Sequence, residues 1–219
     1  MLETLRYIYY AVLFSLTVYS LFALKDIRQF GGTLLVLVLA VTSLVELLGL
    51  GARYKGIGNH ATWIFNLYTI LIIPVYLLIL KDSFSAFSRK AVLYVAGGFM
   101  VLGLVNLFFI QGLQRFNHFT LMLGAALLVL FSLLYFKSRF QNPQENLLKS
   151  WRFWVATGLL MYFPGTLLYF GFLNYLSQFD HGWLMQVTLI LQLMNIMLYT
   201  LFGVALSCLR PRQISSPLL

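Results

Sequence analysis

The sequence predicts an all-α polytopic membrane protein, a single bundle of seven transmembrane helices without a second domain. Hydrophobic residues make up 61% of the chain and charged residues only 10%, whereas soluble domains carry about 25% charged residues. Seven apolar stretches follow one another, each near the roughly 20 residues that a helix needs to cross a bilayer. The longest polar connection between them, 137–152, is too short for a soluble domain.

Charged or polar residues stand at the ends of each apolar stretch, and these positions define the boundaries of the expected helices. In chain order the predicted spans are 5–24, 33–52, 61–80, 91–111, 119–136, 152–174 and 183–209. The basic residues that follow the first five spans and the last one are Lys25, Arg53, Lys81, Arg115, Lys137 and Arg210. The first span is too long for the apolar region of a cleaved signal peptide and no A-x-A site follows it. We therefore expect it to be a permanent span.

Two of the predicted spans contain a proline. Pro74 lies in the third span, and Pro164 is followed by Gly165 near the middle of the sixth. Proline removes a backbone hydrogen bond and kinks a helix. The sixth span is therefore expected to be bent, and the bend serves either as a hinge at Pro164 and Gly165 or as a static kink that packing requires.

The distribution of basic residues predicts the orientation of the bundle. With seven spans, four of the 15 Lys and Arg residues fall on the side of the N-terminus and eleven on the opposite side. Short loops rich in Lys and Arg face the cytoplasm. We expect the N-terminus outside and the C-terminus inside, in the plasma (inner) membrane. The basic residues are scattered over short loops and form no single face, so the pattern does not favour nucleic acid as a partner.

Glu46 is the only acidic residue deep inside a predicted span. Ionisable residues within a membrane are costly, face the bundle interior and often mark function. Several polar side chains fall at similar depth or further in, on the same half of the bundle. The predicted ligand-binding set is Glu46, Asn66, Tyr68, Asn106, Tyr169, Gln186 and Gln192. For the Asn and Gln residues, the alternative is a purely structural role in hydrogen bonds between helices.

All three histidines fall in the connections expected to face outward. Each follows an Asn or Asp and stands just ahead of a span, in the pairs Asn59-His60, Asn117-His118 and Asp180-His181. The histidines His60, His118 and His181 are weak candidates for a metal site, because no two of them share a helical turn. The competing interpretation is that the Asn and Asp side chains cap the following helices. No cofactor is predicted.

Two classes of function fit this pattern. The first is a receptor-like membrane sensor with an outward-facing pocket around Glu46, which signals through a separate membrane or cytoplasmic partner that contacts the Lys137–Arg152 loop. The second is a small secondary transporter that uses the same pocket, and a non-catalytic accessory subunit is a further alternative. No nucleophile and base lie at one depth, and no P-loop or H-E-x-x-H motif occurs. An enzyme is therefore the less favoured class.

Overall fold

The computed structural model describes residues 2–56, 62–84, 86–141, 146–176 and 181–209, and it places no strand among them. Within these residues, seven helices are long and apolar enough to cross a membrane. They are α1 (Leu2–Phe22), α3 (Thr33–Tyr54), α4 (Thr62–Lys81), α5 (Ala86–Val105), α6 (His118–Gln141), α7 (Trp151–Leu176) and α8 (His181–Cys208). The prediction of an all-helical chain with seven such segments is confirmed.

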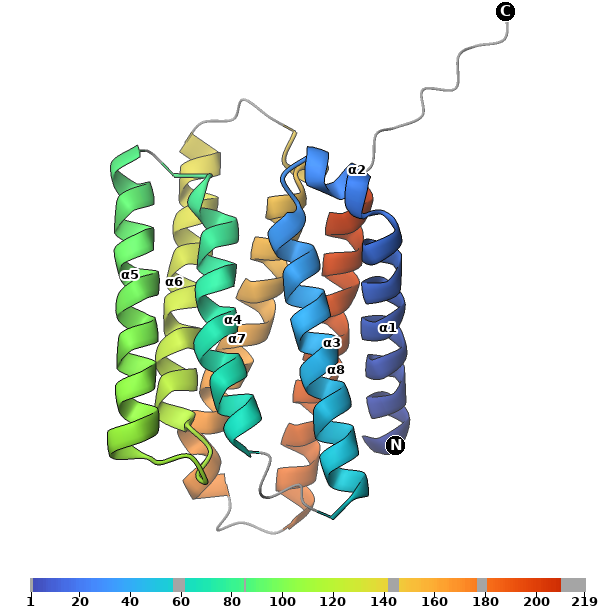
Figure 1. The fold of residues 1–219 in the computed structure, drawn as a ribbon, viewed down its shortest axis with the longest axis vertical. Helices are drawn as coiled ribbons and strands as arrows, with labels where there is room; N and C mark the ends of the chain where they lie inside the picture. The colour runs from blue at the N-terminus through green and yellow to red at the C-terminus, as the bar shows by residue number, and fades with distance from the viewer. Residues whose placement is uncertain (1, 57–61, 85, 142–145, 177–180, 210–219) are drawn as a thin grey trace, which may run out of the picture.

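The long helices run alternately up and down in one bundle, so that their ends form two faces (Figure 1). At the face that we call the Arg6 end, α1, α4, α6 and α8 begin. At the opposite face, the α2 end, α3, α5 and α7 begin, and the short helix α2 (Leu24–Gln29) lies between the end of α1 and the start of α3. Helix α4 packs against α3, α5 and α6, while α1 packs against α3 and α8, so the first and last helices lie side by side.

The segment after the first span differs from the prediction. Residues 25–28, which fall between the first two predicted spans, belong to α2, and α1 ends at Phe22, two residues before the predicted end. The side chain of Ile27 is fully buried and anchors this short helix to the bundle. The turn that follows contains Gly31, whose φ of 74° is a conformation that glycine adopts without strain.

The fourth span is also less regular than predicted. After Val105, the helix continues as a π-helical turn, Asn106–Ile110, and its last hydrogen bond runs from the Gln111 amide to the Asn106 carbonyl at 2.8 Å. A π-helical turn widens the helix, and here it begins at the residue whose buried side chain bonds to α6.

The helices approach closely where small or hydroxyl-bearing residues face a neighbour. Between α1 and α3, the Thr17 hydroxyl lies 2.7 Å from Ser43 Oγ and donates to the Leu39 carbonyl at 3.2 Å. Between α4 and α6, a Cβ atom added to Gly124 would overlap Cδ1 of Ile73. Such contacts are typical of helix packing in membranes, where small residues let backbones approach.

An amphipathic cavity around Glu46

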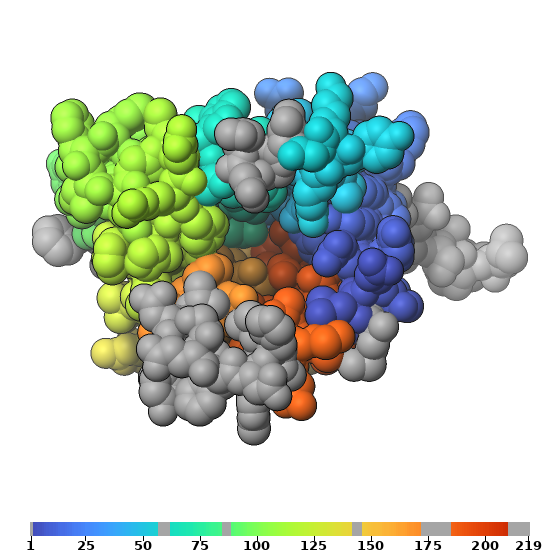
Figure 2. All heavy atoms as spheres, turned by 90° about the horizontal axis from the view of Figure 1, so that it is seen from below, coloured from blue at the N-terminus to red at the C-terminus, as the bar shows by residue number. Residues whose placement is uncertain are grey.

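A cavity of about 640 Å³, which we call the Glu46 cavity, lies between the helices in the half of the bundle nearer the Arg6 end. Residues of α1, α3, α4, α6, α7 and α8 line it. Figure 2 looks onto the Arg6 end, where the surface is hollowed near its centre and atoms of α8 are visible at depth. Cavities that bind small ligands span roughly 300–1,000 Å³, so this one has the size of a binding site.

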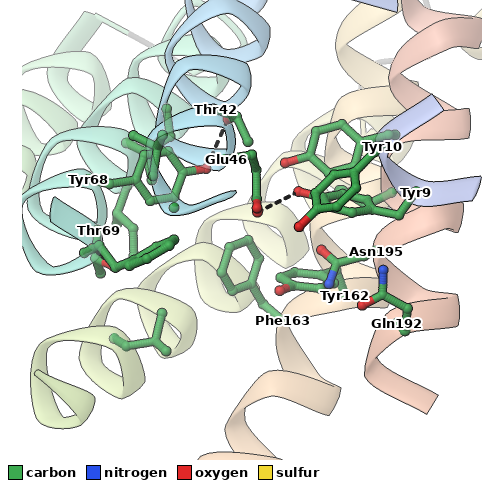
Figure 3. Close-up of a pocket in the computed structure, with 18 of the residues that line it drawn as sticks. Tyr9, Tyr10, Thr42, Glu46, Tyr68, Thr69, Tyr162, Phe163, Gln192 and Asn195 are labelled. Atoms are coloured by element: carbon green, nitrogen blue, oxygen red, sulfur yellow. Dashed lines mark hydrogen bonds between the residues drawn. The ribbon is translucent and has the colours of Figure 1, made fainter. Parts of the chain in front are cut away.

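Glu46 is held at the wall of the cavity by groups from two helices (Figure 3). The Tyr9 hydroxyl of α1 donates a hydrogen bond of 2.9 Å to Oε1 of Glu46. On α3 itself, Nη2 of Arg53 is 4.0 Å from the other carboxylate oxygen and donates to the Tyr10 hydroxyl at 3.0 Å. The side chain of Glu46 is 21% exposed and that of Arg53 is 46% exposed, so the arginine stands at the mouth and the carboxylate further in.

Helical spacing explains why these groups meet. On α3 the lining residues Thr42, Glu46, Gly49 and Arg53 recur every three or four positions, which places them along one face of the helix. On α1 the three lining residues at positions 6, 9 and 10 follow the same spacing. Each helix therefore presents one polar stripe to the cavity.

Aromatic rings close the deeper part of the cavity. The ring centroid of Tyr76 lies 6.3 Å from that of Phe163 and 6.0 Å from that of Phe202. Tyr199 in turn lies 5.7 Å from Phe202 and 5.6 Å from Tyr9. Phe202 is fully buried, so these rings form a packed floor below the polar wall.

Three of the seven predicted ligand-binding residues line the Glu46 cavity: Glu46, Tyr68 and Gln192. The Tyr68 hydroxyl lies 2.9 Å from the Thr42 hydroxyl. Nε2 of Gln192 is buried and has no hydrogen-bond partner among the described residues. An unpartnered buried amide at a cavity wall is a group that a ligand or water can satisfy.

Asn66 and Asn106 do not line the Glu46 cavity. The Asn66 side chain donates to the Arg115 carbonyl at 2.8 Å and accepts from the Asn117 amide at 2.9 Å. Asn106 bonds to Thr120 at 3.0 Å and also to Asn117. Both asparagines thus tie α4 and the π-helical turn to the start of α6, the structural role that was the alternative for them.

Tyr169 and Gln186 are likewise not among the lining residues. The Tyr169 ring packs edge-on against Phe170, with the centroids 5.0 Å apart. Gln186 is exposed on α8. Depth along a helix was the signal that singled out these two residues, but depth does not determine which face of the helix a residue occupies.

Of the three histidines, the structure describes His118 and His181. His60, with Asn59 and Asp180, lies outside the described residues, and His181 is the first residue of α8. Nδ1 of His118 is 2.9 Å from Nε2 of Gln111. The capping interpretation is confirmed at Asn117, whose side chain accepts a hydrogen bond from the Thr120 amide at 3.3 Å. Among the residues that the structure describes, no three His, Cys, Asp or Glu side chains form a group that could hold a metal ion.

The predicted hinge lies next to the cavity. Phe163, which lines the cavity, directly precedes Pro164, and α7 continues through the proline without a break. The Thr166 hydroxyl donates to the Tyr162 carbonyl at 3.2 Å. A Cβ atom added to Gly165 would stand 2.5 Å from the Met194 side chain, so the glycine is where α7 and α8 approach closely.

Sequence reasoning missed most of the tyrosines of the cavity and both of its arginines. The lining residues that it left out of the predicted set include Arg6, Tyr9, Tyr10, Arg53, Tyr76, Tyr162, Asn195 and Tyr199. Tyrosines are common at membrane interfaces and in apolar cores, so residue type alone did not mark them. The spacing of Arg6, Tyr9 and Tyr10 on one helical face was the available signal.

The chain was also compared with known proteins. No protein-family model, curated protein or solved structure matches it.

Proposed function

We propose that this chain is a receptor-like membrane protein that binds a small molecule in the Glu46 cavity. The observation that carries the proposal is the placement of Glu46, whose carboxylate lies in a cavity of ligand size and accepts a hydrogen bond from Tyr9. A carboxylate so far from the helix ends is costly in a membrane. Because Glu46 stands in a cavity wall beside an arginine, recognition of a polar ligand group is favoured as its role over structural support.

The lining suggests the chemistry of the ligand. Glu46 is the one acidic residue among the lining residues, and tyrosine rings surround it. A carboxylate and aromatic faces together suit an amino group or another hydrogen-bond donor. At the mouth, Arg6 and Arg53 suit a carboxylate or another acceptor. The favoured ligand is therefore a small amphipathic molecule with a donor group that reaches Glu46.

The orientation belongs to the same proposal. The excess of Lys and Arg lies at the α2 end, which we place in the cytoplasm of the plasma membrane. The Glu46 cavity, near the Arg6 end, then opens to the outside. Between α1 and α8 the connections are too short for a soluble domain. We therefore propose that the response passes to a partner protein at the α2 end, where α6 ends at Gln141 and α7 begins at Trp151, through movement of α7 at Pro164.

The aromatic floor favours a receptor over a transporter. A transported molecule needs a path from the cavity to the α2 end, and Tyr76, Phe163 and Phe202 pack across that path. Opening such a path would require separation of α4 from α7 and α8. A receptor that transmits a ligand-induced movement through the packed rings needs no such opening.

A thermal-unfolding screen tests the proposal. The purified chain in neutral detergent is screened against small amines, amino acids, carboxylates and neutral sugars, beside the variants Glu46→Gln and Glu3→Gln. Glu3 is exposed at the start of α1 and serves as the matched control. We expect at least one class of compound to raise the unfolding temperature of the wild type and of Glu3→Gln but not of Glu46→Gln. An equal response of all three proteins, or no response in any, contradicts the proposal.

A further inference from the structure

A second cluster of polar side chains lies at the α2 end, where α4 and α6 end and α7 begins. Tyr135 and Arg139 are one turn apart on α6, and the guanidinium carbon of Arg139 is 5.8 Å from the centre of the Tyr135 ring. Arg152, in the first turn of α7, donates a hydrogen bond of 3.1 Å to Asp82, which directly follows α4. Its guanidinium carbon lies 4.7 Å from the centre of the Trp151 ring. Residues of three helices thus converge here.

Several polar atoms in this region are buried without a partner. Tyr135 is 0% exposed, yet its hydroxyl makes no hydrogen bond of normal geometry with the described part of the chain. Nε of Arg152 and Oγ of Ser83 are also buried and unpartnered among the described residues. A buried polar group left unsatisfied costs about 1–3 kcal/mol. A bound group that accepts hydrogen bonds would remove this cost.

The surroundings of the Tyr135 hydroxyl are positively charged. Ser150 and the Arg139 guanidinium lie beside the hydroxyl, and Arg152 is close enough to act on it electrostatically. Ser150 directly precedes α7, whose first backbone N–H groups have no partner inside the helix and carry a partial positive charge. The Asp82 carboxylate pairs with Arg152 at 3.1 Å, and its side chain is 50% exposed. Two guanidinium groups and the start of α7 thus bring positive charge close to the Tyr135 hydroxyl.

We propose that Tyr135, Arg139, Ser150 and Arg152, together the Tyr135 cluster, bind a phosphate group. Each member can donate a hydrogen bond, and arginine forms the strongest such pairs with phosphate and carboxylate oxygens. A phosphate presents several acceptor oxygens to donors that converge from different helices. The cluster lies at helix ends, the depth of the headgroups in a bilayer, so the phosphate comes either from a lipid headgroup or from free phosphate.

The test measures the thermal unfolding of the full chain in neutral detergent. In one arm, inorganic phosphate is titrated at constant ionic strength, with chloride as the balancing anion. In the other arm, phosphatidylglycerol is titrated into the micelles, with phosphatidylcholine as its control. Tyr135→Phe and Arg139→Gln are compared with the wild type and with Lys137→Gln, an exposed cation on the same helix.

We expect the wild type and Lys137→Gln to be stabilised in one or both arms, and the two cluster variants to need about tenfold more phosphate or lipid. A response to phosphatidylglycerol alone identifies a lipid headgroup, and a response to inorganic phosphate identifies the free anion. Without either, Tyr135→Phe should unfold no earlier than the wild type, because the variant loses only an unpartnered hydroxyl.

Three outcomes overturn the proposal. The first is a wild type that responds in neither arm. The second is a Tyr135→Phe variant that responds as the wild type does, and the third is a Lys137→Gln variant that is weakened as much as Arg139→Gln. None of these results bears on the Glu46 cavity, which lies near the other end of the bundle.

Discussion

The Tyr9 hydroxyl donates a 2.9 Å hydrogen bond to the carboxylate of Glu46, 37 residues further along the chain. This contact joins α1 to α3 inside the cavity and fixes one carboxylate oxygen. The other oxygen faces Arg53 at 4.0 Å, longer than a hydrogen bond. Glu46 is thus held in place on one side and incompletely paired on the other.

A double-mutant cycle measures the strength of this contact. We expect Tyr9→Phe and Glu46→Leu to be coupled by about 0.5–2 kcal/mol in the free energy of unfolding, since hydrogen bonds between membrane helices fall in this range. The cycle of Tyr7→Phe with Glu46→Leu is the control, because Tyr7 is 70% exposed. If the coupling free energy of the control cycle were as large, the variants would act through general destabilisation.

The hydroxyl contacts between α1 and α3 predict a second stability effect. Thr17→Val removes a hydroxyl that lies within hydrogen-bond distance of the Leu39 carbonyl and of the Ser43 hydroxyl. We expect a loss of about 0.6–1.7 kcal/mol in unfolding free energy. Thr200→Val is the matched control, because the Thr200 hydroxyl is exposed and bonds to the Ile196 carbonyl of its own helix. A smaller loss for Thr17→Val than for Thr200→Val contradicts the role given to Thr17.

The surroundings of two glycines predict that one position tolerates a large side chain and the other does not. Gly124 faces Ile73 and Phe99, whereas a Cβ atom at Gly97 meets nothing within 4 Å. Gly124→Leu should lower the unfolding free energy by about 1–3 kcal/mol or more through overpacking. Gly97→Leu should leave it unchanged or raise it slightly, because leucine is the better helix former. Equal effects of the two substitutions would show that α4 and α6 are not packed closely at Gly124.

The hydrogen bonds of the Asn106 side chain predict that replacing this residue lowers stability and does not change ligand binding. Asn106→Leu removes the donor that bonds to the Thr120 hydroxyl and the Asn117 side chain and should cost about 1–2 kcal/mol in unfolding free energy. In the ligand screen, the compounds that stabilise the wild type should still stabilise this variant. Loss of their effect, with stability retained, would instead place Asn106 in the ligand-binding site.

The fold was predictable because apolar length is a property of consecutive residues. All seven spans were located from the apolar runs and the charges between them, and the differences lie at the ends. Residues 25–28 carry charges, yet the single apolar residue Ile27 is enough to anchor α2. The π-helical turn begins at Asn106, whose side chain bonds to Thr120 of α6, and no local pattern indicates this tertiary contact.

The cavity was predictable only in part, because its composition depends on how helices rotate against one another. Glu46 stood out by its charge, and Tyr68 and Gln192 by their depth. Asn66 lies at a similar depth but turns toward α6, where it bonds to the Arg115 carbonyl and the Asn117 amide. Tyr9 was missed because a tyrosine in an apolar helix carries no mark of its partner until α3 is placed beside it.

The proposed outward orientation predicts which sites a membrane-impermeant maleimide can reach. In a Cys208→Ser background, which removes the single cysteine, Lys55→Cys at the Arg6 end should be labelled in intact cells. Lys90→Cys, exposed near the start of α5 at the α2 end, should be labelled only after the membrane is opened. The reverse labelling pattern would mean that the bundle has the opposite orientation in the membrane.

Cysteine accessibility inside the cavity tests the proposed outward-facing binding site most directly. In the same background, Val45→Cys places a thiol in the cavity wall beside Glu46, while Ala125→Cys places one in the packed core, where Ala125 is 0% exposed. A small charged methanethiosulfonate reagent added outside intact cells should modify Val45→Cys but should leave Ala125→Cys unmodified. Protection of Val45→Cys from this reagent, or modification only from the cytoplasmic side, would contradict an outward-opening cavity around Glu46.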